Sequence, residues 1–349
     1  MVGAVRAMWS GKRKLGAIGV GALLMLAVVG AATPPWARAT FPGRDGRVVF
    51  TRFQGKGQVY RERLFTMNPD GTAIRLLTDP AWGWFDSDPV WSPDGSQIVF
   101  GRTGPDGNGQ IYTIDADGTH LRKLTHCASG SVHCLASGSP TWTPDGRTIV
   151  FSHCCVPGAG GDHVGLFTMR ADGSHWRRIT LDPDLNFADA GPTVSPDGRW
   201  VAFSRQIGAT PGNANTFISA LCLVRIDGGK VHCITSYHLI VDEKDWSPDG
   251  SRIVFVSHEG SNHGPFRADI FTVAPDGSHL TQLTHTIPGR TLAFQPCWAP
   301  SGDRIMFDYS TNANGTDIFT MKPDGSDRRR VMRTPQFEFG NNWGSAPLA

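Results

Sequence analysis

The sequence predicts an all-β fold: a six-bladed β-propeller of four-stranded antiparallel blades, with the ring closed by the C-terminal strand. Three observations support this prediction. A tryptophan-and-turn pattern recurs about every 52 residues, a second turn pattern lies inside each repeat, and the chain ends on a spare tryptophan segment. No stretch after residue 40 shows the apolar period of a long helix.

The first 39 residues have the composition of an export signal. Four basic residues between Arg6 and Lys14 precede an apolar run over residues 15–32. Ala37 and Ala39 then place small residues at the −3 and −1 positions of a cleavage site. We therefore predict a signal peptide at 1–39 and a single exported domain at 40–349, either secreted or held in the periplasm or cell envelope. An uncleaved membrane anchor is the alternative, because the apolar run is eighteen residues long.

Cleavage would change the charge balance. It would leave 28 basic and 31 acidic residues in the mature chain. Nucleic-acid binding requires a strongly basic surface. We therefore predict no nucleic-acid partner, no membrane span after cleavage, and a monomer.

The first repeated pattern is an aromatic or apolar residue followed by a proline-containing turn that ends in glycine. These glycines are 51, 52, 52 and 52 residues apart: Gly95, Gly146, Gly198, Gly250 and Gly302. A β-branched run ending in phenylalanine follows each one. Proline presets one turn angle and glycine tolerates positive φ, so each copy predicts two strands, a and b, joined by a tight turn.

The second pattern is an Asp-Gly turn between an apolar strand and a closing strand. It occurs six times, and an apolar residue stands six positions after each glycine: Leu77, Leu124, Ile179, Ile234, Leu283 and Val331. These segments predict strands c and d. A single four-stranded sheet cannot bury both of its faces, whereas sheets stacked around an axis bury them against each other.

The chain ends predict how the ring closes. The first repeat lacks a tryptophan strand, and the chain finishes with Asn341-Asn342-Trp343-Gly344, a seventh copy of strand a. We predict that the Trp343 strand completes the first blade. An open solenoid of six units is the alternative.

Together, the Trp-Ser-Pro-Asp-Gly, Ile-Val-Phe and Ile-Phe-Thr-Met segments with a terminal Leu-Thr resemble the WD-like repeat of the TolB propeller family. The resemblance covers about residues 41–345. It implies an exported propeller with a binding role.

Seven cysteines suit an oxidising compartment. Cys127 and Cys134 bracket a short loop between repeats and are one predicted disulfide. Cys222 and Cys233 are a second candidate, because they lie at equal distances from an Asp-Gly turn. A two-residue turn would make them a hydrogen-bonded pair, whose wider spacing suits a disulfide less well. The pairing of three others stays open: Cys154, Cys155 and Cys297.

Topology separates two ends of each blade. Short a–b and c–d turns lie at one end, and variable b–c loops and d–a connectors lie at the other. Variable loops on a rigid scaffold commonly carry function, so we predict the binding surface there. Its b–c loops fall at residues 101–110, 152–165, 204–220, 256–269 and 308–317.

Two series of candidate binding residues lie at this end. The first stands two positions after the strand-b phenylalanine: Arg52, Arg102, His153, Arg205, Ser257 and Tyr309. The second precedes strand-a tryptophans or their equivalent: Asp86, Asp88, Asp189, Asp242, Glu243 and Asp245. The arginines could form a site for an anion or acidic peptide. Alternatively the two series pair within blades, with Arg102 facing Asp86 or Asp88.

Aromatic residues in one connector are a further candidate. Trp82, Trp84 and Phe85 lie between the first and second repeats. Such residues can anchor a peptide or stack on a sugar. They can equally fill the gap between two blades.

No catalytic motif stands out. The sequence lacks a nucleophile elbow and a tight metal-ligand spacing. We therefore predict a protein- or peptide-binding module without cofactor or metal. The alternative is a metal-dependent polysaccharide lyase or hydrolase with loop histidines over the channel: His153, His163, His258 and His263. A purely structural platform is a third possibility.

Overall fold

The computed structural model describes residues 41–56, 59–126, 137–154, 164–180, 187–207, 218–259, 267–311, 316–333 and 337–345. The predicted signal peptide lies outside these residues. The described part of the chain forms strands and one short 3-10 helix, η1 (Tyr237–Leu239). Over that part, no helix has the length and apolar character needed to cross a membrane.

The strands group into four-stranded units, numbered here along the chain, with strands a to d running from the inside outward. Unit 1 contains β24 (Glu338–Ser345), β1 (Asp45–Lys56), β2 (Val59–Met67) and β3 (Arg75–Leu76). Unit 2 contains β4 (Phe85–Trp91), β5 (Gln97–Thr103), β6 (Gly109–Asp115) and β7 (Arg122–Lys123). Unit 3 contains β8 (Ser137–Trp142), β9 (Thr148–Cys154), β10 (Val164–Arg170) and β11 (Arg177–Arg178).

The remaining units follow the same order. Unit 4 contains β12 (Phe187–Val194), β13 (Trp200–Ile207), β14 (Ile218–Arg225) and β15 (His232–Cys233). Unit 5 contains β16 (Val241–Trp246), β17 (Ile253–Glu259), β18 (Arg267–Val273) and β19 (Thr281–Gln282). Unit 6 contains β20 (Thr291–Trp298), β21 (Ile305–Thr311), β22 (Thr316–Met321) and β23 (Arg329–Met332).

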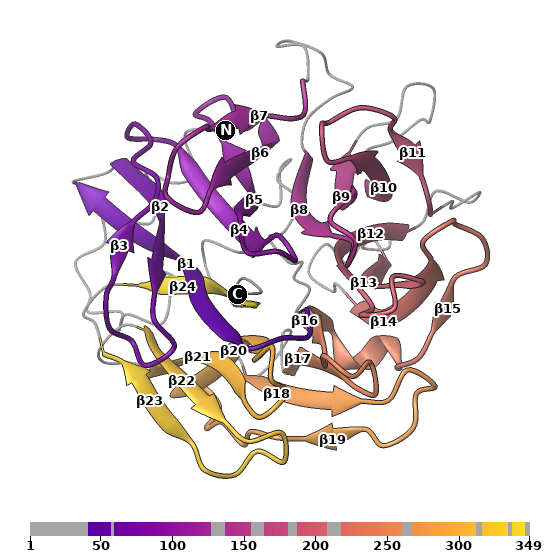
Figure 1. Cartoon of the computed structure of the whole chain (residues 1–349). Coiled ribbons are helices and arrows are strands. Elements are labelled where there is room, and N and C mark those ends of the chain that lie inside the picture. The colour runs from indigo at the N-terminus through magenta and orange to yellow at the C-terminus, as the bar shows by residue number, and fades with distance from the viewer. Residues whose placement is uncertain are drawn as a thin grey trace, which may run out of the picture.

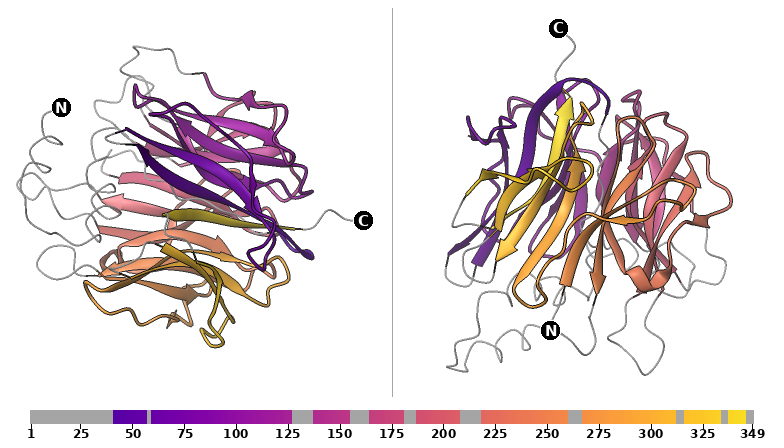
Figure 2. Two further views of the ribbon diagram at one scale, coloured as in Figure 1. Left: turned by 90° about the vertical axis from the view of Figure 1, so that its left-hand side faces the viewer. Right: turned by 90° about the horizontal axis from the view of Figure 1, so that it is seen from below.

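The units are arranged around a common centre. Figure 1 shows the a strands on the inside and the d strands at the periphery, and Figure 2 shows the packed sheets from two sides. β24 pairs antiparallel with β1 and places Trp343 opposite Val48. Residues from the two ends of the chain therefore share one sheet.

One part of the sheet topology departs from the prediction. Units 3 to 6 are separate antiparallel sheets, but units 1 and 2 form one mixed eight-stranded sheet. The link is a single parallel pair between Glu62 and Phe85, flanked by a hydrogen bond from Gly83 N to Tyr60 O. β3 pairs with β2 over only two residues, so the rest of that edge is open to the connector before β4.

The core lies between neighbouring units. Six apolar clusters each combine residues of two adjacent units, and each contains the strand-a aromatic or its equivalent from the later unit: Trp91, Trp142, Val194, Trp246, Trp298 and Trp343. All six are almost completely buried. Burial of such side chains contributes about 1.5–3 kcal/mol each, which explains the repeat of the tryptophan.

Inside five units, the strand-b phenylalanine lies beside an aromatic ring on strand c. The pairs are Phe50–Phe65, Phe100–Tyr112, Phe151–Phe167, Phe255–Phe271 and Phe307–Phe319. In unit 4 the residue opposite Phe203 is Cys222, which forms a disulfide with Cys233 on strand d. A covalent bond thus occupies the position that an aromatic pair holds elsewhere.

The backbone geometry at this disulfide differs from the prediction. Ile234 N donates to Leu221 O on one side of the pair, so Cys222 and Cys233 form the narrow, non-hydrogen-bonded kind of pair. The predicted two-residue turn was wrong, because the connection spans residues 226–231. Cys127, Cys134 and Cys155 lie outside the described residues, as does the Cys154 side chain, and Cys297 is buried.

Removing this disulfide should destabilise the protein. We expect Cys222→Val/Cys233→Val to lower the free energy of unfolding by about 2–3 kcal/mol, because the bond restricts the unfolded chain over a short loop. Valine retains the apolar volume, so the difference isolates the covalent link. Urea unfolding of both proteins measures it, and equal midpoints would contradict the prediction.

Candidate functional site

The inner strands carry a repeated irregularity near the end predicted to bind. Five equivalent residues, three positions before the strand-a aromatic, have positive φ: Asp88, Ser139, Gly191, Gln295 and Gly340. Each strand a also shows a register shift typical of a β-bulge. Gln295 N donates to the Glu243 carboxylate, and Gly340 N donates to the Gln295 side chain. These hydrogen bonds therefore link unit 5 to unit 6 and unit 6 to unit 1, and Glu243 is a buried part of that link.

Two predicted arginines bind carboxylates of their own units. Arg102 donates through Nε and Nη2 to Asp86, at 2.5 and 2.7 Å. Arg205 donates in the same way to Asp189, at 2.7 and 2.8 Å. Both carboxylates are buried. This is the pairing that the sequence offered as the alternative to an anion site.

Arg52 follows the same pattern across the two ends of the chain. Its Nε donates to Glu338 Oε1 at 2.7 Å, and its guanidinium lies 4.5 Å from the Phe65 ring centroid. Burial raises the pKa of Glu338 to about 7, although Arg52 acts in the opposite direction. Burial likewise raises the pKa of Asp86 above its ordinary value, opposed by Arg102.

The other members of the first series also make local contacts. His153 is buried, with Nδ1 2.9 Å from Ser137 Oγ and its ring edge-on to Phe167 at 5.3 Å. Ser257 donates to the Leu239 carbonyl. Tyr309 is half-buried and lies edge-on to Phe319, 5.5 Å away. The described contacts of this series therefore hold each residue within its own unit or against the connector before it.

The aromatic connector lies at the seam between units 1 and 2. Trp82 and Trp84 are both half-buried, and the Arg61 guanidinium stands 4.5 Å from the Trp82 ring centroid. Glu62 N donates to Trp84 O at 3.1 Å, which holds the connector along β2. The two tryptophans thus combine a fixed backbone with partly exposed rings.

Carboxyl groups gather at the same seam. Burial raises the pKa of Glu62 to about 8, and the nearby charges of Asp88 and Asp86 act in the same direction. Asp88 is buried, with Ser139 Oγ 3.5 Å from its Oδ2. Sequence reasoning missed Glu62, because its position beside Asp86 follows from the parallel pair that joins the two units.

The histidines considered for a metal site are dispersed. His258 Nε2 lies 3.5 Å from Asp242 Oδ2. His163 and His263 lie outside the described residues. Among the residues that the structure does describe, no three or more His, Cys, Asp or Glu side chains converge as metal ligands would.

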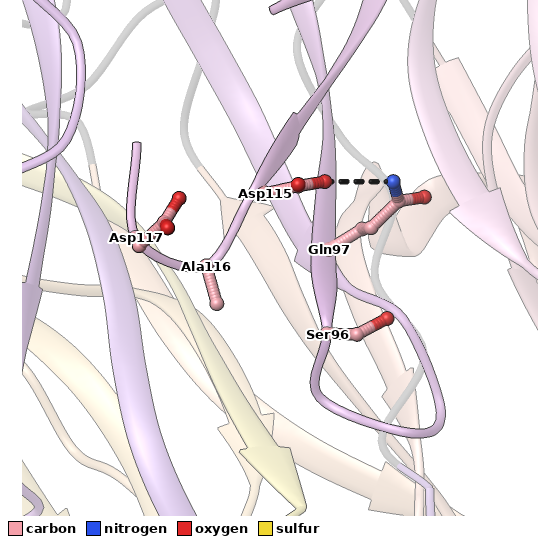
Figure 3. Close-up of a pocket in the computed structure, with 5 residues that line it drawn as sticks. All are labelled: Ser96, Gln97, Asp115, Ala116 and Asp117. Atoms are coloured by element: carbon pink, nitrogen blue, oxygen red, sulfur yellow. Dashed lines mark hydrogen bonds between the residues drawn. The ribbon is translucent and has the colours of Figure 1, made fainter. Parts of the chain in front are cut away.

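An open pocket lies at the opposite end of unit 2, between its two short turns. Its volume is about 470 Å³, and Figure 3 shows its lining by Ser96, Gln97, Asp115, Ala116 and Asp117. Gln97 Nε2 donates to Asp115 Oδ1 at 2.9 Å. The pocket is therefore separate from the connector seam.

The chain is similar to known proteins over much of its length. It is 27% identical over 224 residues to an uncharacterized protein of Agrobacterium fabrum, covering 62% of this chain and 67% of that protein. It is 26% identical over 184 residues to the Tol-Pal system protein TolB of Francisella tularensis, covering 52% of this chain and 37% of that protein. The structure of TolB from Acinetobacter baumannii superimposes with a TM-score of 0.64 at 19% identity, covering 86% of this chain and 67% of that one.

These matches differ in what they establish. The chain spans little more than a third of the Francisella protein, and the structural match supports the fold alone. The family model of the TolB beta propeller domain matches residues 41–228, more than half of the chain. The chain therefore belongs to the TolB β-propeller domain family.

Proposed function

We propose that this chain is an exported six-bladed propeller, closed by β24, that binds a protein or peptide at its connector end. The six apolar clusters between successive units, one of which joins units 6 and 1, support the closed ring. The Cys222–Cys233 disulfide supports export, because disulfides persist in oxidising compartments. Membership in the TolB β-propeller domain family supports a binding role.

The observation that carries the proposed binding site is the Trp82–Trp84 connector. Its two tryptophans are half-buried and its backbone is held on β2. Tryptophan supplies a large, rigid contact area at low entropic cost, and it is enriched among residues that dominate binding energy. The partner would therefore bury these two rings at the seam between units 1 and 2.

The arginine series fits this role less well. Arg102 and Arg205 each already bind a buried carboxylate through two hydrogen bonds. An acidic partner would have to replace these contacts and leave a carboxylate buried without its cation, which is costly. We therefore assign these arginines to the support of the surface, and the tryptophans to contact with the partner.

The proposed site can be tested with matched tryptophan variants. Trp82→Ala/Trp84→Ala should weaken partner binding by about tenfold or more, as expected for anchoring aromatics. Trp200→Ala is the control, because Trp200 is also partly exposed beneath an arginine but lies at the turn end of unit 4. A partner captured from envelope extract and identified by mass spectrometry provides the ligand for calorimetry. Equal dissociation constants for the three folded proteins would refute the site.

A further inference from the structure

Charge is sorted from the centre of the molecule to its rim. The innermost strands carry seven acids and one base: Glu338, Asp86, Asp88, Asp189, Asp242, Glu243 and Asp245, with Lys244. The outermost strands carry seven bases and no acid: Arg75, Arg122, Lys123, Arg177, Arg178, Arg329 and Arg330. A chain with a mild acidic excess after cleavage therefore presents its positive charge at the periphery.

The positive charge lies on one side of the rim. These basic residues lie on units 6, 1, 2 and 3, which follow each other around the centre through shared apolar clusters. In unit 6, Arg329 and Arg330 form ion pairs with Asp327 and Asp317. β15 and β19, the outermost strands of units 4 and 5, contain only His232, Cys233, Thr281 and Gln282. Figure 1 shows β3, β7 and β11 along the periphery of units 1 to 3.

Large apolar side chains accompany the cations on units 1 to 3. Ile74 and Leu76 flank Arg75 and are 41% and 49% exposed. Leu121, before Arg122, is 46% exposed, and Trp176, before Arg177, is 38% exposed. Leu280 is similarly exposed in unit 5, but threonine follows it. On the outermost strands and the residues that flank them, exposed apolar and basic side chains therefore occur together in units 1 to 3, whereas exposed apolar residues usually occur singly.

Two of these arginines donate hydrogen bonds to neutral carbonyl oxygens, which do not neutralise their charge. Arg122 Nη2 donates to the Asp172 carbonyl at 2.9 Å, and Arg177 Nη1 donates to the Asp227 carbonyl at 2.8 Å. Carbonyl oxygens orient a guanidinium without neutralising it. The Asp172 carboxylate is instead bonded to Ser174 within its own turn. The strands therefore expose oriented cations, and the nearby carboxylates sit in the turns at one end.

We propose that the rim of units 1 to 3 docks on the surface of an anionic lipid bilayer. The guanidinium groups would contact the lipid phosphates, and the aliphatic and tryptophan side chains would enter the boundary between headgroups and acyl chains. A soluble acidic polymer would use the cations but would gain little from exposed isoleucine, leucine and tryptophan. The docking surface is separate from the connector end, so a docked molecule could still bind a partner there.

Co-sedimentation with vesicles tests the proposal on the full mature chain. The protein should sediment with phosphatidylcholine vesicles containing about a quarter phosphatidylglycerol but not with pure phosphatidylcholine, and added salt should reduce the bound fraction. Arg122→Gln/Arg177→Gln should weaken the apparent affinity about thirtyfold, since each basic residue near such a surface contributes on the order of 1 kcal/mol and about 1.4 kcal/mol is a factor of ten. Arg199→Gln/Arg225→Gln, on exposed arginines of unit 4, is the matched control and should bind like the wild type.

A second variant guards against misfolding of the arginine variant. Ile74→Ser/Leu76→Ser breaks no described hydrogen bond and should also weaken binding to the anionic vesicles severalfold. The proposal would be overturned if the wild-type protein did not sediment with the anionic vesicles, or if the unit 4 control lost as much affinity as the Arg122→Gln/Arg177→Gln variant. So would a polyglutamate peptide that binds while the vesicles do not, because that result would identify a polymer site.

Discussion

Arg102→Met should lower the free energy of unfolding by about 3–5 kcal/mol, the largest loss we expect from a single substitution here. The variant leaves the Asp86 carboxylate, whose residue is 0% exposed, without the cation that binds it through two hydrogen bonds. The apolar stem of methionine preserves much of the packing against Tyr112, where the guanidinium now stands 5.1 Å from the ring centroid. Urea unfolding at neutral pH measures the loss.

Two comparisons separate the buried charge from other causes. Arg102→Met/Asp86→Leu removes both partners and should recover most of the stability, because no carboxylate is then left unpaired. Arg225→Met breaks an exposed pair with Asp227 and should cost less than about 1 kcal/mol. If the double variant were as unstable as the single one, loss of packing rather than buried charge would explain the effect.

The loss in Arg102→Met should also depend on pH. Burial already raises the folded-state pKa of Asp86 above the unfolded value of 3.8, and removal of Arg102 raises it further. Between the unfolded and folded pKa values the folded state holds a proton that the unfolded chain has lost, so stability falls as pH rises. The deficit relative to wild type should therefore be smaller in acid than at neutral pH.

Lys244 should make the wild-type protein more stable as pH rises above 8. The residue is 2% exposed, its Nζ donates to the Gly191 carbonyl at 2.9 Å, and burial lowers its pKa from 10.5 to about 8. Between these values the unfolded chain binds a proton that the folded state does not, so the free energy of unfolding increases with pH. The full increase is on the order of 3 kcal/mol and is complete near the unfolded pKa.

The matched variants are Lys244→Met and Lys230→Met, the second at an exposed lysine of unit 4. Between neutral pH and pH 10.5, the free energy of unfolding of wild type should rise by about 3 kcal/mol more than that of Lys244→Met, because methionine cannot release a proton. The free energy of unfolding of Lys230→Met should follow the same pH dependence as that of wild type. Subtraction of the wild-type value at each pH cancels the titration of the groups that the proteins share. A constant difference for Lys244→Met would show that the lysine titrates normally in the folded state.

Much of the architecture was predictable because the same strand and turn patterns recur along the sequence. Each tryptophan of strand a fills the interface with the preceding unit, so its recurrence encodes the stacking of sheets. The pairing of the Trp343 strand with β1 followed from the one unit that lacked such a strand. The link between β2 and β4 was not predictable, because it depends on how a connector lies against an edge left open by a two-residue strand.

The site was predictable only in part. Adjacency of strands a and b predicted that Arg102 pairs with Asp86 or Asp88, and the register of the strands places Asp86 directly opposite Arg102. The positive φ at Asp88 and its equivalents could not be predicted, because these positions share no residue type: aspartate, serine, glycine and glutamine all occur there. Glu62 became part of the seam only through that unpredicted link. Sequence patterns that predict single strands well therefore do not predict the contacts that connectors make.

Unit 1 combines β1 with β24, so it cannot be completed during synthesis until β24 has been made. Arg52 and its partner Glu338 are 286 residues apart in sequence, so β1 is made long before β24 exists. Until β24 is synthesised, one edge of β1 carries unpaired backbone groups and can pair with a strand of another molecule. Truncation before Gly340 should therefore favour aggregation during synthesis, even though the other described strands would all be present.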